Sequence, residues 1–335
     1  MEKLKWGILG AAKIAIDQVI PAIQQSDLGA VWGIASRNET NAREVADQFS
    51  IPKSYGTYEA LLDDSEIDVV YIPLPNHLHF PWIEKCLQAG KHVLCEKPLA
   101  LNTSEVKSLM QLKEGTGLKV SEAFMVKSHP QWQHVEHILN DGALGKLQIV
   151  NGMFTYNMTD LENVRYVAEW GGGGLFDVGV YPIFTTRHAI KEVPTRVFAT
   201  TKLDKPGGVD VVASGILDFP SVQMTFSCGM QVADTQFLQF LGTEKRLELK
   251  IPFNPEPGTP VEFQLHDNNI HNLEYESIVL ESCNQYTLMC DDLANAILND
   301  ATEPVPLEDT LINTAILEAL FRSAQLGQWV EPDYD

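Results

Sequence analysis

Hydrophobic and polar positions follow one rhythm in the first part of the chain. Short apolar runs of strand length alternate there with longer stretches in which apolar residues recur every three or four positions. This order is typical of a parallel sheet with crossover helices. The predicted strands are residues 4–9, 30–35, 69–72, 93–95 and 119–123, and the predicted helices are 13–25, 42–49, 82–89 and 103–113.

The rhythm changes after a predicted helix at residues 129–140. Strand-like runs then follow one another with few helical stretches between them, which indicates a second, mostly antiparallel sheet. These runs are residues 147–156, 196–203, 211–219, 222–229 and 235–249, and helical patterns return at 284–298 and 307–326. We therefore predict two domains, residues 1–124 and 125–335, the second being an α+β domain with a large open sheet.

Length and charge exclude several classes of protein. The 335 residues are enough for two domains, and 45 acidic against 24 basic side chains give a formal charge of −21. Such a balance argues against a nucleic-acid partner and leaves a small polar substrate open. No apolar run approaches the roughly 20 residues that cross a bilayer, so we expect a cytoplasmic protein without membrane contact. The five scattered cysteines predict reduced thiols and no metal site.

A glycine-rich turn follows the first predicted strand. Its sequence approximates the dinucleotide fingerprint G-x-G-x-x-G/A, with an alanine in place of the middle glycine. Small residues are also common at such turns for packing reasons, but the position after the first strand favours a dinucleotide on a helix N-terminus. The fold class is thus α/β, an N-terminal Rossmann doubly wound sheet. The predicted cofactor residues of this turn are Gly10, Ala11, Ala12, Lys13 and Ile14.

The end of the second strand bears on the choice between NADP and NAD. It carries Ser36 and Arg37 and no acidic residue at its tip, so the carboxylate that binds the ribose of NAD is missing. A guanidinium matches the oxygens of a 2′-phosphate, which favours NADP. A solvated arginine is the alternative, and Glu39 keeps NAD possible.

Two further strand ends carry candidate chemistry. Pro73, Asn76 and His79 follow one strand, where ligands of open α/β sheets bind, although a structural histidine is nearly as plausible for His79. Glu96 and Lys97 follow the next strand and precede a proline. Taken alone, Lys97 reads as a surface lysine, but beside a nicotinamide its pKa would fall and proton exchange with a hydroxyl would become easier.

The second half contains the glycine run of residues 171–174. Asp177 and Tyr181 follow it four positions apart and so share a face of a predicted helix. A carboxylate can orient hydroxyl groups, and a phenol can exchange a proton. A loop followed by a helix with a capping aspartate is the alternative. Pro182 predicts a kink near Val178.

These motifs together resemble the glucose-fructose oxidoreductase, inositol dehydrogenase and MocA family. The pieces are residues 7–15, 75–79, 96–98, 122–125, 163–165, 172–181 and 242–243. Tyr181 stands where most of the family has a histidine, which resembles the subgroup of dimeric dihydrodiol dehydrogenase and NADP-dependent D-xylose dehydrogenase.

The resemblance implies a role for each candidate residue. Lys97 and Tyr181 would be the acid/base pair, Asp177 would orient the substrate, and Arg37 would select NADP. A homodimer through the C-terminal sheet is also implied. The substrate residues on this reading are Lys97, Phe124, Phe154, Arg165, Trp170, Asp177 and Tyr181.

The sequence thus predicts an NADP-dependent oxidoreductase that transfers hydride from a sugar or polyol hydroxyl. The first choice of substrate is an aldose such as D-xylose, oxidised to the lactone. A trans-dihydrodiol or another carbonyl or hydroxyl compound is the alternative substrate, since the fold does not fix it. A non-catalytic NAD(P) sensor is an alternative of another class, against which the presence of Lys97, Asp177 and Tyr181 speaks.

Overall fold

The computed structural model describes residues 3–205, 208–269, 271 and 274–335. The chain forms two compact units. The first consists of Met1–Ser128 and Asn284–Leu311, and the second of His129–Cys283 and Ile312–Asp335.

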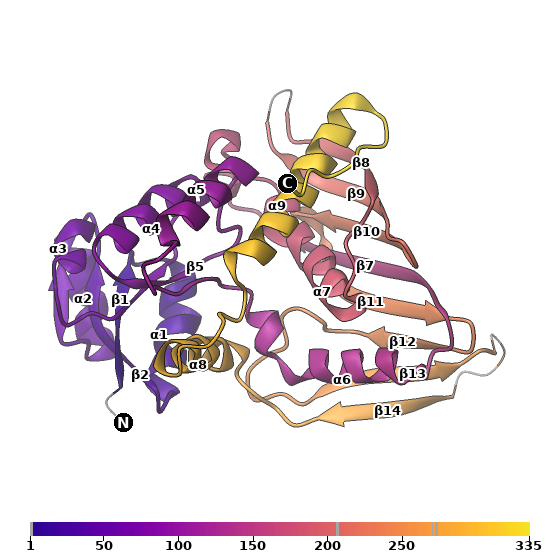
Figure 1. The fold of residues 1–335 in the computed structure, drawn as a ribbon, viewed down its shortest axis with the longest axis horizontal. Helices are drawn as coiled ribbons and strands as arrows, with labels where there is room; N and C mark the ends of the chain where they lie inside the picture. The colour runs from indigo at the N-terminus through magenta and orange to yellow at the C-terminus, as the bar shows by residue number, and fades with distance from the viewer. Residues whose placement is uncertain (1–2, 206–207, 270, 272–273) are drawn as a thin grey trace. The chain divides into compact units, whose positions relative to one another are not determined.

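A six-stranded parallel sheet with strand order β3-β2-β1-β4-β5-β6 forms the centre of the first unit (Figure 1). Its order reverses direction at β1 and β4, so it is the predicted doubly wound sheet. The strands are β1 (Leu4–Leu9), β2 (Gly29–Ala35), β3 (Lys53–Tyr55), β4 (Val69–Ile72), β5 (His92–Cys95) and β6 (Val120–Glu122). The helices are α1 (Ile20–Gln25), α2 (Glu39–Phe49), α3 (Tyr58–Leu62), α4 (His79–Gln88), α5 (Thr103–Lys113) and α8 (Gln285–Leu298).

Strand β3 and helix α3 were not predicted from the sequence. They are three and five residues long, too short to show a hydrophobic period. By contrast, the predicted start of α5 is confirmed, because Asn102 Oδ1 accepts a hydrogen bond of 2.9 Å from the amide of Glu105.

The division of the chain at residue 124 differs from the structure. Asn284–Leu311 returns to the first unit, where Asp291 bonds to Ser26 and the Thr310 hydroxyl donates to Glu122 over 2.9 Å. These contacts join residues far apart along the chain. Hydrophobic periodicity describes contiguous residues only, so it does not predict them.

The second unit is built on an eight-stranded sheet of order β14-β13-β12-β11-β7-β10-β9-β8, in which only the β7 and β10 pair is parallel. The predicted mostly antiparallel sheet is confirmed. The strands are β7 (Leu147–Asn157), β8 (Arg196–Leu203), β9 (Asp210–Asp218), β10 (Gln223–Gly229), β11 (Gln231–Gly242), β12 (Lys245–Leu249), β13 (Val261–Asp267) and β14 (Tyr275–Leu280). The helices are α6 (Pro130–Asn140), α7 (Val180–Ile190) and the larger part of α9 (Leu307–Leu326).

The predicted single strand 235–249 is two strands in the structure. A side chain at Gly242 would bring its Cβ to 2.0 Å from the carbonyl oxygen of Leu144. Glycine therefore permits a close approach of two main chains there, and the chain turns before β12 begins.

One face of the eight-stranded sheet is covered, and the other is half-exposed and carries both polar and apolar side chains. Along β9 the buried side chains alternate with half-exposed ones. The half-exposed face includes two hydrogen-bonded pairs, Ser214 with Ser227 at 2.8 Å and Asn151 with Thr225 at 2.8 Å. Ile149, on the same face of β7, is 46% exposed.

A π-helical turn precedes each of two helices that contain proline. Residues Ala15–Val19 form such a turn before α1, and Leu175–Gly179 form one before α7. Proline lacks the amide that an α-helix needs, and a wider turn just before it changes the bonding partners of the carbonyl groups. Where a kink was predicted near Val178, the structure has a π turn instead, and the helix continues through Pro182.

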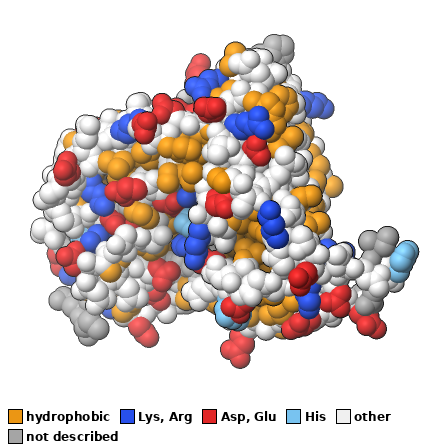
Figure 2. Space-filling model, turned by 45° about the vertical axis from the view of Figure 1, so that its right-hand side comes forward, with side chains coloured by type: hydrophobic (Ala, Val, Ile, Leu, Met, Phe, Trp, Pro, Cys, Tyr) orange, Lys and Arg blue, Asp and Glu red, His pale blue; other side chains and the backbone are white. Residues whose placement is uncertain are grey.

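The surface is acidic without one dominant patch in view. On the face drawn in Figure 2, acidic side chains lie singly among basic and apolar ones. Within the described residues, no helix has both the length and the apolar character needed to span a bilayer.

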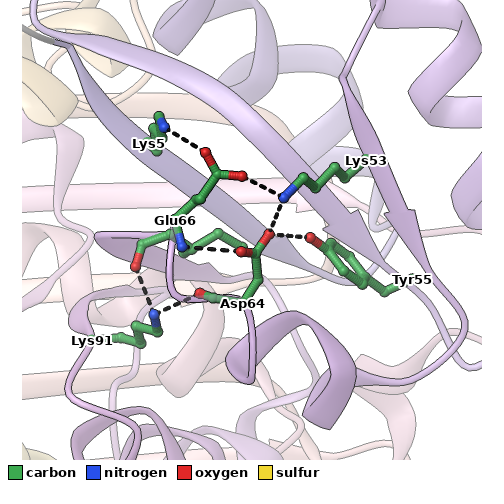
Figure 3. Close-up of polar contacts among 7 residues, drawn as sticks. Lys5, Lys53, Tyr55, Asp64, Glu66 and Lys91 are labelled. Atoms are coloured by element: carbon green, nitrogen blue, oxygen red, sulfur yellow. Dashed lines mark hydrogen bonds and ion pairs between the residues drawn. The ribbon is translucent and has the colours of Figure 1, made fainter.

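A network of lysines and carboxylates closes the amino edge of the six-stranded sheet (Figure 3). Lys53 Nζ lies 2.8 Å from Asp64 Oδ2 and 2.7 Å from Glu66 Oε2. The hydroxyl of Tyr55 donates to the same Asp64 oxygen over 2.5 Å. Burial opposes ionisation of Asp64, but the hydrogen bonds from Lys53 and Tyr55 prevail and lower its pKa to about 2.

We expect Asp64→Asn to lower the free energy of unfolding by about 1–2 kcal/mol at pH 7. The pKa of Asp64 is depressed in the folded state, so its stabilisation is present above the ordinary value of 3.8 and is lost as the pH falls toward 2. Urea unfolding at pH 7 and pH 3 should therefore show a smaller difference from wild type at pH 3. Asp63→Asn, at the exposed neighbouring position, is the control; equal effects at both pH values would contradict the assignment.

Candidate active site

The turn after β1 forms a cradle of main chain. Gly10 has φ +113°, which favours glycine, and its amide donates to the carbonyl of Ala35 over 2.8 Å. A Cβ at this position would lie 3.1 Å from Leu74 Cδ2. Ala11 and Ala12 are half-buried, while the side chain of Lys13 is 89% exposed and pairs with Asp17. The cradle fits the close approach of a pyrophosphate to backbone amides.

The end of β2 presents Arg37 at the surface. The hydroxyl of Tyr58 is hydrogen-bonded to the Arg37 side chain, and Ser36 Oγ accepts from the amide of Asn38 over 3.2 Å. Asn38 is in turn the N-cap of α2. A guanidinium beside a helix N-terminus suits an anionic group such as a 2′-phosphate. Glu39 pairs with Arg43 at 3.0 Å.

Tyr58 is a residue that the sequence reasoning missed. It comes from the unpredicted helix α3, and it lies beside both Arg37 and the Gly10 cradle. Its ring packs edge-on against Trp82 at 4.9 Å between centroids. No local motif marks such a residue, because only the sheet brings these segments together.

His79 lies buried beneath two of the strand ends. Its Nδ1 is 2.8 Å from the carbonyl oxygen of Pro98, and its Nε2 is 2.7 Å from that of Leu74. Burial is the main cause that lowers the pKa of His79 to about 4; the charge of Lys97 acts in the same direction, and the two carbonyl oxygens oppose it. The ring therefore lies between the turns after β4 and β5 and, when neutral, donates to one of the two carbonyl oxygens. Its contact with the cofactor stays a prediction.

Lys97 stands on a turn that is held on both sides. Before it, the hydroxyl of Tyr71 donates to Glu96 Oε1 over 2.7 Å. After it, the amide of Leu99 donates to Glu122 Oε1 over 2.9 Å. Lys97 is half-buried, and the bond that it forms with Pro98 is a cis peptide. The braces fix the main chain from which the lysine projects.

In the neighbouring turn after β4, Pro73 is buried and Asn76 half-buried.

In the second unit, Asp177 is held by two polar side chains. The Tyr156 hydroxyl donates to Asp177 Oδ2 over 2.5 Å, and Arg165 Nε lies 2.8 Å from the same oxygen. Asp177 raises the pKa of Arg165 above its ordinary value despite burial. The predicted residues Asp177 and Arg165 are thus together, whereas Tyr156, near the end of β7, was missed.

Tyr181 belongs to the same cluster. It is 5% exposed and packs against Phe154 and Phe253, with ring centroids 5.5 and 5.9 Å away. It also contributes to the raised pKa of Arg165, so a carboxylate, a guanidinium and a phenol act on one another. Such a cluster can orient a polyol and exchange a proton.

The remaining predicted substrate residues differ in accessibility. Trp170 is 39% exposed, whereas Phe154 is 7% exposed and Phe124, in the first unit, is 1% exposed. The rings of Phe124 and Phe154 are therefore buried, and their predicted place in a substrate pocket stays a prediction.

Each unit thus holds part of the chemistry of a dehydrogenase. The first has a dinucleotide cradle and a braced lysine, and the second has the cluster of Asp177, Arg165 and Tyr181. A doubly wound parallel sheet joined to a large open sheet with these residues defines a class of two-domain, nucleotide-dependent oxidoreductases.

Comparison with known families agrees with this class. Residues 4–124 match the oxidoreductase family with an NAD-binding Rossmann fold, and residues 132–248 match the GFO/IDH/MocA C-terminal domain. The chain belongs to the GFO/IDH/MocA family of oxidoreductases, as the motifs predicted.

Relatives at full length support the same placement. An uncharacterised oxidoreductase of Rhizobium meliloti is 38% identical over 98% of this chain and 99% of its own. A D-xylose 1-dehydrogenase (NADP(+)) of Haloferax volcanii is 33% identical over 98% and 100%. Mouse trans-1,2-dihydrobenzene-1,2-diol dehydrogenase is 33% identical over 68% of each chain. The predicted subgroup is therefore confirmed.

Solved structures share the whole architecture. A 3-ketoreductase from Actinomadura kijaniata, crystallised with NADP and TDP-benzene, superposes with a TM-score of 0.89 and 29% identity over 96% of this chain and 98% of its own.

We expect Arg37→Ala to weaken NADP binding at least about tenfold and NAD binding less than twofold, because only NADP offers a phosphate to the guanidinium. Fluorescence titration of each cofactor measures both affinities. Arg43→Ala, which removes the other arginine of this segment, is the control. Equal weakening of NADP and NAD by Arg37→Ala would show that the end of β2 does not read the phosphate.

Proposed function

We propose that this protein is an NADP-dependent dehydrogenase that oxidises an aldose such as D-xylose at its anomeric carbon. The observation that carries the proposal is the full-length likeness to D-xylose 1-dehydrogenase (NADP(+)). It is supported by Lys97 on its braced turn and by the cluster around Asp177.

The cofactor residues follow from the first unit. The amides of the Gly10 turn bind the pyrophosphate, and Ser36 and Arg37 bind the 2′-phosphate. Pro73, Asn76 and Glu96 lie along the strand ends where the remaining part of the dinucleotide binds. When bound, NADP supplies a nicotinamide that accepts a hydride.

The chain's own residues manage the hydroxyl group. Asp177, held by Tyr156 and Arg165, accepts hydrogen bonds from substrate hydroxyls and so orients the sugar. Tyr181 takes the proton of the anomeric hydroxyl, and Lys97 of the first unit is the other proposed acid/base residue. When the hydroxyl oxygen has lost this proton and the anomeric carbon its hydride, the bond between that carbon and oxygen is the carbonyl of a lactone.

A second candidate is a carbonyl or diol substrate of another kind. Relatives include dihydrodiol dehydrogenases and dTDP-3,4-didehydro-2,6-dideoxy-alpha-D-glucose 3-reductases, one of them, from Actinomadura kijaniata, 31% identical over 96% of this chain. The same acid/base residues would then return a proton to the product alcohol. A cytoplasmic location remains part of the proposal.

We expect NADP reduction with D-xylose and related aldoses to exceed that with inositols and dihydrodiols. Absorbance at the wavelength of reduced nicotinamide measures each reaction, with NAD in parallel. Turnover of a dihydrodiol with NADP, or of a TDP-linked keto sugar with NADPH, without turnover of any aldose would transfer the assignment to the second candidate.

The same assay tests the role of Tyr181 with the variant Tyr181→Phe, which keeps the packing of the ring against Phe154 and Phe253. Removal of one hydroxyl should lower kcat at least about a hundredfold, the usual contribution of a positioned acid/base group. Turnover within a few-fold of wild type would remove Tyr181 from the mechanism.

We also propose that the half-exposed face of the eight-stranded sheet pairs two copies of the chain. Ile149 lies between Leu241 and Gln223 in the sheet register, and half-exposed Met153 and Phe237 share this face with polar side chains, so apolar groups are available for an interface with a polar rim.

Light scattering of the wild type should then give twice the chain mass of 37.3 kDa. Ile149→Asp should shift the population toward monomer, because it places a charge in the buried face. Leu112→Asp, at an exposed leucine of α5, should not. A monomeric wild type at micromolar concentration would remove the dimer from the proposal.

A further inference from the structure

The helix that carries Asp177 and Tyr181 begins from a glycine turn packed against the loop before it. The amide of Gly173 donates to the carbonyl of Arg165 over 3.0 Å. A Cβ on Gly172 would lie 2.4 Å from that carbonyl oxygen, and Gly173 has φ +118°. Space therefore requires glycine at position 172, and backbone conformation favours it at position 173.

The carboxylate of Asp210 packs against the other side of this turn. Asp210 is the first residue of β9 and is 3% exposed. Its Oδ2 accepts a hydrogen bond of 2.7 Å from the amide of Leu175, and the amide of Gly174 also donates to the carboxylate. A Cβ on Gly173 would lie 2.1 Å from Asp210 Oδ1.

These amides belong to the first turn of the helix, where main-chain donors have no partner within the helix. A carboxylate that accepts from them replaces the missing partners and lies at the positive end of the helix dipole. Asp177 follows Leu175 by two residues, and its amide makes a first-turn bond of 3.0 Å to the carbonyl of Gly173. A displacement of the main chain at Leu175 therefore displaces Asp177 as well.

We propose that Asp210 is a positioning residue whose ionised carboxylate fixes the start of this helix, and thereby sets Asp177 and Tyr181 against Tyr156 and Arg165. The expected effect on catalysis rests on the proposed function, whereas the effect of Asp210 on the start of the helix does not depend on it.

The charge state of Asp210 gives the proposal a signature. Burial is the main cause that raises its pKa to about 7; the charge of Asp177 acts in the same direction, and the amide hydrogen bonds oppose both. The buried thiol of Cys228 on β10 also faces this carboxylate. Because a protonated carboxyl accepts fewer hydrogen bonds, kcat should fall as the pH drops through about 7.

The raised pKa of Asp210 also distinguishes a positioning role from a purely stabilising one. A carboxylate whose pKa is raised in the fold disfavours the folded state at pH values above its ordinary pKa. Asp210→Asn should therefore leave the melting temperature at pH 8 unchanged or higher. The side chain of asparagine, however, turns its NH2 donor toward a main-chain N–H of the turn. Two donors cannot bond to each other, so we expect the start of the helix to be displaced.

The experiment compares Asp210→Asn with Asp218→Asn. Asp218 ends the same strand and pairs with Arg196 at 2.8 Å at the surface, so it is a matched control. In Asp210→Asn we expect kcat to fall at least about tenfold with NADP affinity within twofold of wild type, and the acidic limb of the pH profile near 7 to disappear. Asp218→Asn should behave as wild type in each respect.

Two results would overturn the proposal on the kinetic side. One is kcat of Asp210→Asn within twofold of wild type with an unchanged pH profile. The other is a loss of activity that accompanies a lower melting temperature and is recovered on cooling.

Hydrogen exchange distinguishes failure of this proposal from failure of the proposed function. Without any substrate, the amides of residues 173–181 should exchange faster in Asp210→Asn than in wild type or Asp218→Asn. If the wild type oxidises no aldose or diol, the proposed function fails while faster exchange still supports the hold of Asp210 on the helix. Unchanged exchange overturns that hold.

Discussion

Buried carboxylates that accept hydrogen bonds from main-chain amides hold the two proposed reactive segments of this protein. Glu122 accepts from the amide of Leu99, just after Lys97, over 2.9 Å. Asp210 accepts from the amide of Leu175, just before Asp177, over 2.7 Å. A buried carboxylate without donors is costly, so the surrounding chain must present its amides there. Each reactive segment is thus fixed by a strand residue distant in sequence.

The basic side chains of this acidic protein differ in the groups that bind them. At the amino edge of the six-stranded sheet, Lys53 is compensated by Asp64 and Glu66. In the second unit, Arg165 is committed to Asp177. At the carboxyl edge, Arg37 is exposed and bonds to the neutral hydroxyl of Tyr58. An acidic protein can bind an anionic cofactor through an exposed arginine whose hydrogen-bond partner is a neutral hydroxyl.

Sequence reasoning about the site was strongest where chemistry and local position coincide. Gly10, Arg37 and Lys97 each follow a strand whose apolar run is evident, and the structure places all three at strand ends. Tyr58, Tyr156 and Asp210 carried no local signal, because each acts through a residue far along the chain. Glu122 belongs to one of the motifs that resemble the family, but its bond to Leu99 was not predicted. Pro182 was expected to kink its helix, but a π turn before it accommodates the missing amide.

The sequence by itself determined the fold class, because hydrophobic period is a property of contiguous segments, and its motifs together carried the resemblance to the family and the proposed reactive residues. Tertiary structure alone decided that residues 284–311 return to the first unit and that 235–249 divides into two strands. It also decided which buried groups brace Lys97 and Asp177. Hydrogen bonds between distant segments depend on how sheets and helices pack, and no periodic pattern along the chain encodes that packing.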